Sequence, residues 1–204
     1  MKIKVARCAG FCFGVKRAIN IAENSLKGLE GKEGIYSLGP IIHNPQVVDR
    51  LSKKGLKVIK GQENIKGGTV IISSHGAPIE VLDEIKKKGI KIIDATCPFV
   101  KYAQNIVRHL KKEGYRIIIV GDSAHPEVKA LKSIAGNPLT LTLSPKGRGK
   151  GEGEKIGVIS QTTQNKENYI NEISKILAGD FNEVRVFNTI CNDTSKRQSA
   201  TRSL

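Results

Sequence analysis

The chain has 204 residues, of which 39% are hydrophobic, and this is enough for one large domain or two domains of ordinary size with a buried core. Its formal net charge of +15 at pH 7 makes nucleic-acid binding the first function to consider. No apolar run approaches the roughly 18 residues that a membrane-spanning helix needs, so the sequence predicts no membrane span.

The distribution of the charge argues against a nucleic-acid interface. Lysines are scattered over segments of helical period, as in 86–88 and 111–112, and the chain has no tryptophan and few other aromatics that could stack on bases. We therefore interpret the charge as a solvated surface whose field would also attract a smaller anionic ligand. A basic nucleic-acid-binding protein whose cysteines hold zinc stays open as an alternative.

The cysteines and the start of the chain indicate a cytoplasmic protein. No secretory signal precedes the first predicted strand, which starts at Ile3. In a reducing compartment, thiols more often serve metals or catalysis than disulfides.

Apolar residues follow strand and helix periods in alternation along the chain. Strands are predicted over residues 3–7, 35–38, 56–59, 69–73 and 90–94, and helices over 14–26, 45–51 and 79–88. The order then restarts with a helix over 98–113 and strands over 116–120, 156–160 and 184–187. The glycine- and lysine-rich segment 138–154 is predicted to be a flexible loop. Alternating strands and helices indicate parallel sheets, which bind ligands beyond the carboxyl ends of their strands.

Three cysteines occupy the same place in this order, at the turn from a strand to a helix. They are Cys12, Cys97 and Cys191. The unpaired N–H groups and the positive dipole end of a helix N-terminus favour the thiolate form there. We interpret the chain as a pseudo-threefold repeat of small parallel-sheet α/β domains. Residues 1–97 form the first unit, residues 98–190 the second, and residues 191–204 the start of a third unit that is largely missing.

Three separated cysteines at equivalent strand-to-helix turns fit a metal site built by the repeat. Iron–sulfur clusters are usually held by four thiolates, a pattern that three cysteines do not complete. Structural zinc normally uses Cys/His pairs at short spacing, which this sequence lacks. A 4Fe-4S cluster held by only three thiolates would leave one iron open to a substrate oxygen. Cys8 precedes the predicted helix and has no counterpart in the second unit, so we interpret it as a structural thiol, with a role as substitute ligand as the alternative.

Three of the four histidines lie in turns that the repeat places beside the cysteines, namely His43, His75 and His125. Imidazole N–H groups and helix N-termini both suit phosphate oxygens, so we expect a polyanion site. His109 lies within a predicted helix and is expected on the surface. Glu127 comes two residues after His125, where it could complement a helix dipole or donate a proton to a leaving hydroxyl, and the spacing leaves both roles open.

Six motifs, in order, resemble the LytB/IspH family of 4-hydroxy-3-methylbut-2-enyl diphosphate reductases, and the resemblance covers the chain from its start to about Gln198. The motifs are Gly10-Phe11-Cys12-Phe13-Gly14-Val15, Ile42-His43-Asn44, Ser74-His75-Gly76, Asp94-Ala95-Thr96-Cys97-Pro98, His125-Pro126-Glu127-Val128 and Gln161-Thr162-Thr163. The resemblance implies a trefoil of three α/β domains around a central iron–sulfur cluster. It also implies the last step of the methylerythritol phosphate route to isoprenoids, in which an allylic diphosphate loses its hydroxyl.

The resemblance assigns a role to each candidate residue by its motif. A 4Fe-4S cluster would be held by Cys12, Cys97 and Cys191. The diphosphate would be held by His43, His75 and His125. Glu127 would relay a proton, and Thr162 would position the substrate hydroxyl.

The same resemblance implies the partners. They are the allylic diphosphate substrate and an electron donor such as ferredoxin or flavodoxin, with no nucleic acid and no membrane, and the protein is expected to be a monomer.

Two features depart from the family pattern. Family members continue through a third domain that completes the diphosphate pocket, and this sequence stops at Leu204. The basic segment 138–154 looks inserted where the family has a strand and a short helix. We therefore expect the chain on its own to be weakly active or inactive, with a folded remnant that holds no cluster as a further alternative.

Overall fold

The computed structural model describes residues 2–27, 34–61, 63, 65–136, 139–141 and 154–204. Within these ranges no helix is both long enough and apolar enough to cross a membrane. The chain divides into two compact units, each of which is described by itself. The N-terminal unit is Cys12–Lys101, and the C-terminal unit combines Met1–Phe11 with Tyr102–Leu204.

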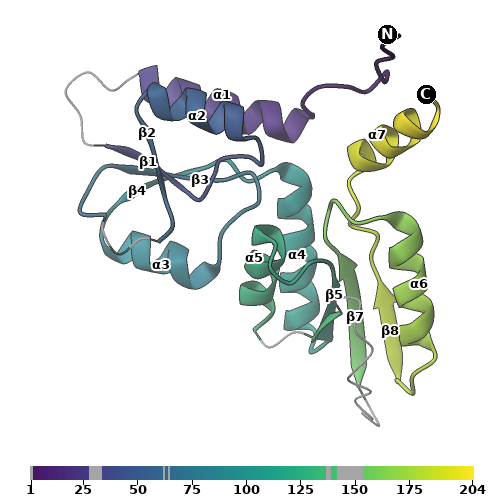
Figure 1. Cartoon of the computed structure of the whole chain (residues 1–204). Coiled ribbons are helices and arrows are strands. Elements are labelled where there is room, and N and C mark those ends of the chain that lie inside the picture. Colours follow the sequence, from purple (N-terminus) through teal and green to yellow (C-terminus); the bar gives the residue numbers. More distant parts are fainter. Residues whose placement is uncertain (1, 28–33, 62, 64, 137–138, 142–153) are drawn as a thin grey trace. The chain divides into compact units, whose positions relative to one another are not determined.

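The N-terminal unit is a four-stranded parallel sheet with helices on both faces (Figure 1). Its elements are α1 (Phe13–Lys27), β1 (Ile35–Leu38), α2 (Pro45–Lys53), β2 (Leu56–Ile59), β3 (Thr69–Ile72), α3 (Ile79–Lys87) and β4 (Lys91–Asp94). The strand order is β2-β1-β3-β4, and the last residues of these strands lie in register with one another. The turns that follow the strands therefore emerge at a single edge of the sheet.

Alternate residues of β3 explain why helices cover both faces of this sheet. Ile71 packs into one hydrophobic cluster with residues of α1 and α2. Its neighbours Val70 and Ile72 point to the other face, where they pack with Ile85 of α3. Successive strand residues point to opposite faces, so a strand segment buried on both sides is apolar throughout, as 70–72 is.

The C-terminal unit repeats this topology. Its elements are α4 (Pro98–Lys112, which starts in the N-terminal unit), β5 (Arg116–Val120), α5 (Pro126–Ala135), β6 (Leu139–Leu141), β7 (Lys155–Ser160), α6 (Lys166–Leu177), β8 (Glu183–Val186) and α7 (Asn192–Arg202). The strand order β6-β5-β7-β8 is the counterpart of β2-β1-β3-β4. Parallel-sheet α/β architecture and the internal repeat are thus confirmed, whereas the exact unit boundaries stay a prediction.

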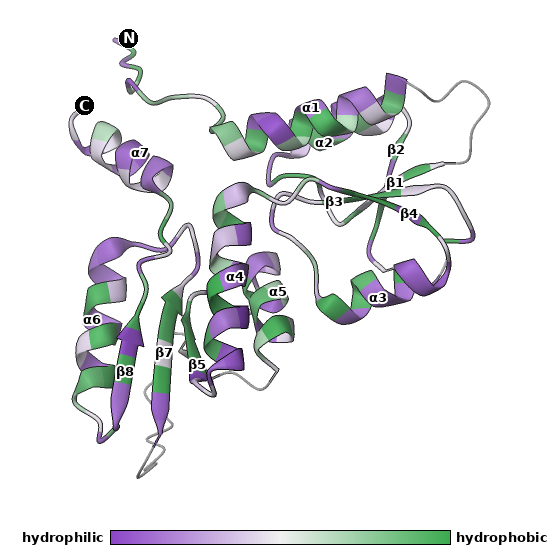
Figure 2. Cartoon of the chain, turned by 180° about the vertical axis from the view of Figure 1, so that it is seen from behind, coloured by the Kyte–Doolittle hydropathy of each residue, from purple (hydrophilic) through white to green (hydrophobic). Residues whose placement is uncertain are grey.

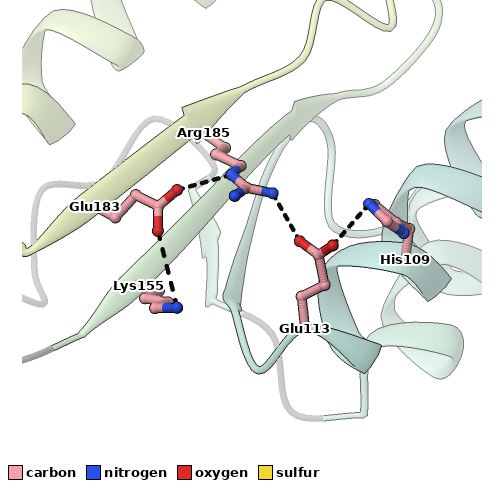
Figure 3. A network of polar contacts seen from close by, with 5 residues as sticks. All are labelled: His109, Glu113, Lys155, Glu183 and Arg185. Carbon is pink, nitrogen blue, oxygen red and sulfur yellow. Dashed lines mark hydrogen bonds and ion pairs between the residues drawn. The ribbon is translucent and has the colours of Figure 1, made fainter.

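An ion-pair network covers one part of this sheet (Figure 3). Arg185 of β8 donates from Nη1 to Glu113 Oε2 at 2.7 Å and from Nε to Glu183 Oε1 at 2.8 Å. His109 Nε2 lies 3.1 Å from Glu113 Oε1, and Lys155 Nζ lies 4.0 Å from Glu183 Oε2. These groups are partly exposed, so water and salt screen each pair and its contribution to stability is small. The expectation that His109 belongs to the surface is confirmed.

Two predicted elements differ from the structure. Residues 3–7 form no strand, because no strand of either sheet pairs with them, and Ile3 and Val5 are 74% and 73% exposed. Segment 138–154 is not loop throughout, since β6 pairs in parallel with β5, and Glu154 forms an ion pair with Arg116 at 2.9 Å. Residues 142–153 of the predicted loop lie outside the described residues.

Helix α7 differs from the other helices because none of its residues is buried. Figure 2 shows this helix as predominantly hydrophilic, whereas the helices over the sheets carry an apolar stripe. Its sequence, Asn192–Arg202, contains no large apolar residue, so the helix contributes little to any core.

Candidate functional site

The thiols of Cys12 and Cys97 converge within the N-terminal unit. Each cysteine directly precedes a helix, α1 or α4, as the sequence predicts. A Cβ placed on Gly14 would lie 2.5 Å from Cys97 Sγ and 4.0 Å from Cys12 Sγ, so both sulfurs border the same small space, which only glycine leaves open. The Val15 N–H donates to Cys12 Sγ at 3.4 Å, which ties the sulfur to the first turn of α1.

Hydrogen bonds at the end of β4 fix the turn that carries Cys97. The Cys97 N–H donates to the Ser74 carbonyl at 3.0 Å, which joins the turns after β3 and β4. Asp94 Oδ1 accepts from the Thr96 N–H at 2.8 Å, and Arg17 Nη1 donates to the Thr96 carbonyl at 3.1 Å. Burial acts to raise the pKa of Asp94, but hydrogen bonds from Lys101 and Thr96 outweigh it and hold that pKa below its usual value. The carboxylate is therefore charged and keeps the turn rigid.

His43 and His75 form a pair at the same edge of this sheet. Their ring centroids lie 4.1 Å apart with an interplanar angle of 33°. The turns that carry them are joined by the Ser74 N–H, which donates to the Ile41 carbonyl at 3.1 Å. Asn44 follows His43 and caps α2 by accepting from the Val47 N–H at 2.9 Å. Two adjacent imidazoles can offer N–H donors to one anion.

In the C-terminal unit, the carboxyl group of Glu127 is buried against Thr162. Glu127 lies in the first turn of α5 and is 1% exposed. Its Oε1 accepts from the Thr162 N–H and its Oε2 from the Thr162 hydroxyl, both at 2.7 Å. Burial raises the pKa of Glu127 to about 7, although both hydrogen bonds act to lower it. Near neutral pH this carboxyl group can therefore release or take up a proton.

His125 is the N-cap of α5. Its Nδ1 accepts from the Glu127 N–H at 3.2 Å. In the neutral ring the proton must then be on Nε2, so that Nε2 is a hydrogen-bond donor. The half-buried ring thus caps α5 by accepting the backbone N–H of Glu127.

Cys191 is hydrogen-bonded to Thr162, which lies in the turn after β7 and also holds the carboxyl group of Glu127. The Cys191 N–H donates to the Thr162 carbonyl at 2.8 Å, just as the Cys97 N–H donates to the Ser74 carbonyl. Cys191 is the N-cap of α7. Asn188 Oδ1 accepts from the Ile190 N–H at 3.2 Å, which repeats the capping of Thr96 by Asp94. The cysteine turns of the two units therefore share their hydrogen-bonding pattern.

Several buried polar residues beside these groups received no role from the sequence, although Gln161 lies in one of the six motifs. Gln161 is 8% exposed, and its Oε1 accepts from the Asp122 N–H at 3.0 Å. Ser160 and Thr189 are 0% and 4% exposed and bond to each other. The signal that could have found them is their position at the carboxyl ends of predicted strands. Cys8 has a free, half-buried thiol in the C-terminal unit, and its structural role stays a prediction.

The candidate residues thus form two sets. Within the N-terminal unit, the structure brings together the two thiols of Cys12 and Cys97 and, at the same sheet edge, the rings of His43 and His75. Within the C-terminal unit it connects His125, Glu127, Thr162 and Cys191 through direct hydrogen bonds.

Comparison with known proteins shows the family to which a chain with these residues belongs. The profile of a family described as LytB protein matches residues 3–204. The 4-hydroxy-3-methylbut-2-enyl diphosphate reductase of Aquifex aeolicus is 46% identical over 206 aligned residues, which include 99% of this chain and 70% of that protein. The chain belongs to the LytB family. A second LytB relative of the same name, from Syntrophotalea carbinolica, is 47% identical, with 100% of this chain and 72% of that protein covered.

Solved structures also match. One is described as (E)-4-hydroxy-3-methyl-but-2-enyl diphosphate reductase, the terminal enzyme of the non-mevalonate pathway. It has a TM-score of 0.81 and 44% identity, and the match covers 99% of this chain and 72% of that one. The E-1-hydroxy-2-methyl-but-2-enyl-4-diphosphate reductase from Plasmodium falciparum also has a TM-score of 0.81, with 27% identity and coverage of 96% of this chain and 62% of that one.

Proposed function

We propose that this chain carries active-site residues for the reductive removal of the hydroxyl group from 4-hydroxy-3-methylbut-2-enyl diphosphate. The substrate gains two electrons and two protons, the C–O bond breaks, and the products are water and isopentenyl or dimethylallyl diphosphate. Membership of the LytB family and relatives named for this reaction support the proposal. The observation that carries it is the buried Glu127 carboxyl group, whose pKa is raised to about 7 by burial and which Thr162 holds by two hydrogen bonds.

Glu127 would supply the proton that the departing hydroxyl needs. A carboxylic acid donates best when its pKa lies near the working pH, and at about 7 the pKa of Glu127 meets this condition. The Thr162 hydroxyl donates to Glu127 Oε2 and keeps its remaining acceptor capacity for a substrate hydroxyl. Thr162 would therefore orient the substrate oxygen next to the group that protonates it.

The diphosphate would be bound by His43, His75 and His125. The adjacency of the first two rings, 4.1 Å between centroids, supports a shared anionic ligand. The Nδ1 atom of His125 accepts a backbone N–H, so its Nε2–H is the group that can donate to a phosphate oxygen. The N-termini of α2 and α5 begin beside His43 and His125 and would add backbone donors and a favourable dipole.

An iron–sulfur cluster held by Cys12, Cys97 and Cys191 would complete the site. The residues fit this group, because all three cysteines are half-buried and form no disulfide in the part of the chain that the structure describes, and two of their thiols border one small space at Gly14. Thiolates at helix N-termini are suitable ligands for such clusters, which supply the electrons of a reduction when bound. With this assignment the three thiols would bind the cluster, the three histidines would bind the diphosphate, and Glu127 would donate the proton.

An external electron donor such as ferredoxin or flavodoxin would reduce the protein, and a cytoplasmic monomer remains our expectation. The four cysteines form no disulfide among the described residues, which agrees with a reducing compartment.

The test is anaerobic turnover of the diphosphate substrate by the iron-loaded chain with a reduced viologen as donor. We expect turnover, and a Glu127→Gln variant should be slower by roughly 100-fold or more, the usual effect of losing a general acid. Thr201→Val, an exposed substitution on α7, is the matched control and should retain the rate. A Glu127→Gln rate equal to that of the unmodified chain would contradict the role of Glu127.

A further inference from the structure

The parallel pairing of β7 and β8 is interrupted just before Cys191. The last regular bond runs from the Phe187 N–H to the Val158 carbonyl at 2.9 Å. The next bond of a parallel ladder would run from the Ser160 N–H to the Phe187 carbonyl. Instead, the Ser160 N–H donates to Thr189 Oγ1 at 2.9 Å, and the Phe187 carbonyl accepts from the Tyr169 hydroxyl at 2.7 Å. Two side-chain hydroxyls thus replace one backbone bond.

The Thr189 hydroxyl is fully used in this arrangement. It donates to the Ser160 carbonyl at 2.5 Å, accepts from the Ser160 N–H, and lies 3.0 Å from Ser160 Oγ, which can supply the third hydrogen. A hydroxyl has one donor and two acceptor positions, so no further bond is available to it. Thr189 and Ser160 are 4% and 0% exposed, so water cannot easily replace a lost bond.

This replacement changes how the chain reaches Cys191. In the N-terminal unit the Ala95 N–H donates to the Ile72 carbonyl, and two residues later the Cys97 N–H donates to the Ser74 carbonyl. In the C-terminal unit the Phe187 N–H donates to the Val158 carbonyl, and the next backbone bond, from the Cys191 N–H to the Thr162 carbonyl, comes four residues later. Thr189 lies halfway between Phe187 and Cys191, and its hydroxyl binds this segment to the backbone of Ser160 at the end of β7.

We infer that Thr189 is a positioning residue that sets the place of the Cys191 thiol relative to Thr162, and that it does so by substituting for a strand bond at Ser160. The inference rests on the proposed function, in which Cys191 is a cluster ligand. It predicts that the hydroxyl is required and the methyl group is not. Serine at position 189 should therefore preserve the geometry, and valine, which has nearly the same shape, should not.

Two measurements on the full chain separate this role from ordinary core stability. The first is hydrogen–deuterium exchange, without iron, of peptides that cover 188–194, with peptides of β5 and of the N-terminal unit as internal references. In Thr189→Val we expect exchange at 188–194 to be at least roughly fivefold faster, as for the loss of a buried hydrogen bond, with the reference peptides unchanged. Thr189→Ser and the exposed control Thr201→Val should exchange like the unmodified chain.

The second measurement is iron and acid-labile sulfide per chain after anaerobic reconstitution. Thr189→Val should bind less than half of the iron that the unmodified chain binds, and Thr189→Ser should restore it. If the unmodified chain binds no iron, the proposed cluster is wrong, while the exchange experiment still tests the attachment of Cys191 by Thr189. Unchanged exchange at 188–194 in Thr189→Val would overturn the inference, as would faster exchange over the whole C-terminal unit, which indicates general destabilisation.

Discussion

Thr162 holds the buried carboxyl group of Glu127 with its backbone N–H and its hydroxyl, each at 2.7 Å, while its carbonyl accepts the N–H of Cys191 at 2.8 Å. Thr162, in the turn that follows β7, thus connects the carboxyl group of Glu127 to Cys191, a candidate cluster ligand. The two hydrogen bonds favour the charged carboxylate, and burial opposes it more strongly, so that the pKa of Glu127 is raised to about 7.

Replacing Glu127 with glutamine should alter how stability depends on pH. The folded pKa of about 7 lies above the ordinary 4.5, so the folded state binds the proton more tightly than the unfolded state. This contribution to stability is fully present below the unfolded pKa and is lost as the pH rises through the folded pKa. Between about pH 5 and about pH 8 the unmodified chain should lose roughly 2 to 3 kcal/mol of unfolding free energy from this group, and Glu127→Gln should not.

Urea unfolding followed by circular dichroism measures this difference. Because glutamine is neutral, Glu127→Gln should gain stability relative to the unmodified chain at the higher pH while losing turnover. Parallel pH profiles for the two proteins would contradict the raised pKa of Glu127.

Replacing Thr162 with valine should raise the pKa of Glu127 further. Valine removes the hydroxyl donor at Oε2 but keeps the backbone donor at Oε1, so the charged carboxylate loses one stabilising bond. Carbon-13 NMR of labelled glutamate side chains would follow the titration. Thr162→Ser retains the hydroxyl and is the control; a lower pKa of Glu127 in Thr162→Val would contradict the geometry.

Gly14→Ala should displace the Cys97 thiol. Helix propensity alone would make alanine more favourable by up to about 1 kcal/mol. However, the new Cβ would lie 2.5 Å from Cys97 Sγ, so the sulfur must move. We expect reduced iron content and an altered rate of alkylation at Cys97, measured by mass spectrometry. Asn20→Ala on the exposed face of α1 is the control, and iron content unchanged in Gly14→Ala would show that the two thiols need not share this space.

His43→Asn and His75→Asn should each weaken the binding of inorganic pyrophosphate. Loss of one charge-assisted hydrogen bond corresponds to a dissociation constant higher by roughly tenfold or more. Isothermal titration calorimetry measures this change, and the two effects should not add, because the rings are in contact. His109→Ala, in the surface network of Figure 3, should leave binding unchanged. Equal effects of all three variants would indicate only a general contribution of positive charge.

Most of the regular elements could be predicted because their apolar periods are clear. The strands predicted over 35–38, 56–59 and 116–120 have the bounds of β1, β2 and β5. The strand predicted over 3–7 was wrong because alternation alone does not provide a partner strand. Strand β6 was missed because only three residues form it, and glycine and lysine dominate the segment around it.

The candidate site could be predicted at the level of residues but not of contacts. Cysteine and histidine stand out at strand-to-helix turns, and their motifs indicated which of them belong together. The buried bonds of Ser160, Thr189 and Tyr169 are different, because serine, threonine and tyrosine are common in strands and turns and their partners lie far away in the sequence. The pKa of Glu127 also depends on burial, which the spacing of residues does not give.

Iron, acid-labile sulfide and zinc per chain after anaerobic reconstitution, with a visible spectrum of the same sample, test the central claim most directly. We predict about four irons with matching sulfide, as expected of a 4Fe-4S cluster, retained in Cys8→Ser and lost in Cys12→Ser, Cys97→Ser and Cys191→Ser. Zinc in place of iron, or iron that survives the loss of Cys191 but not of Cys8, would contradict the assignment of the three thiols.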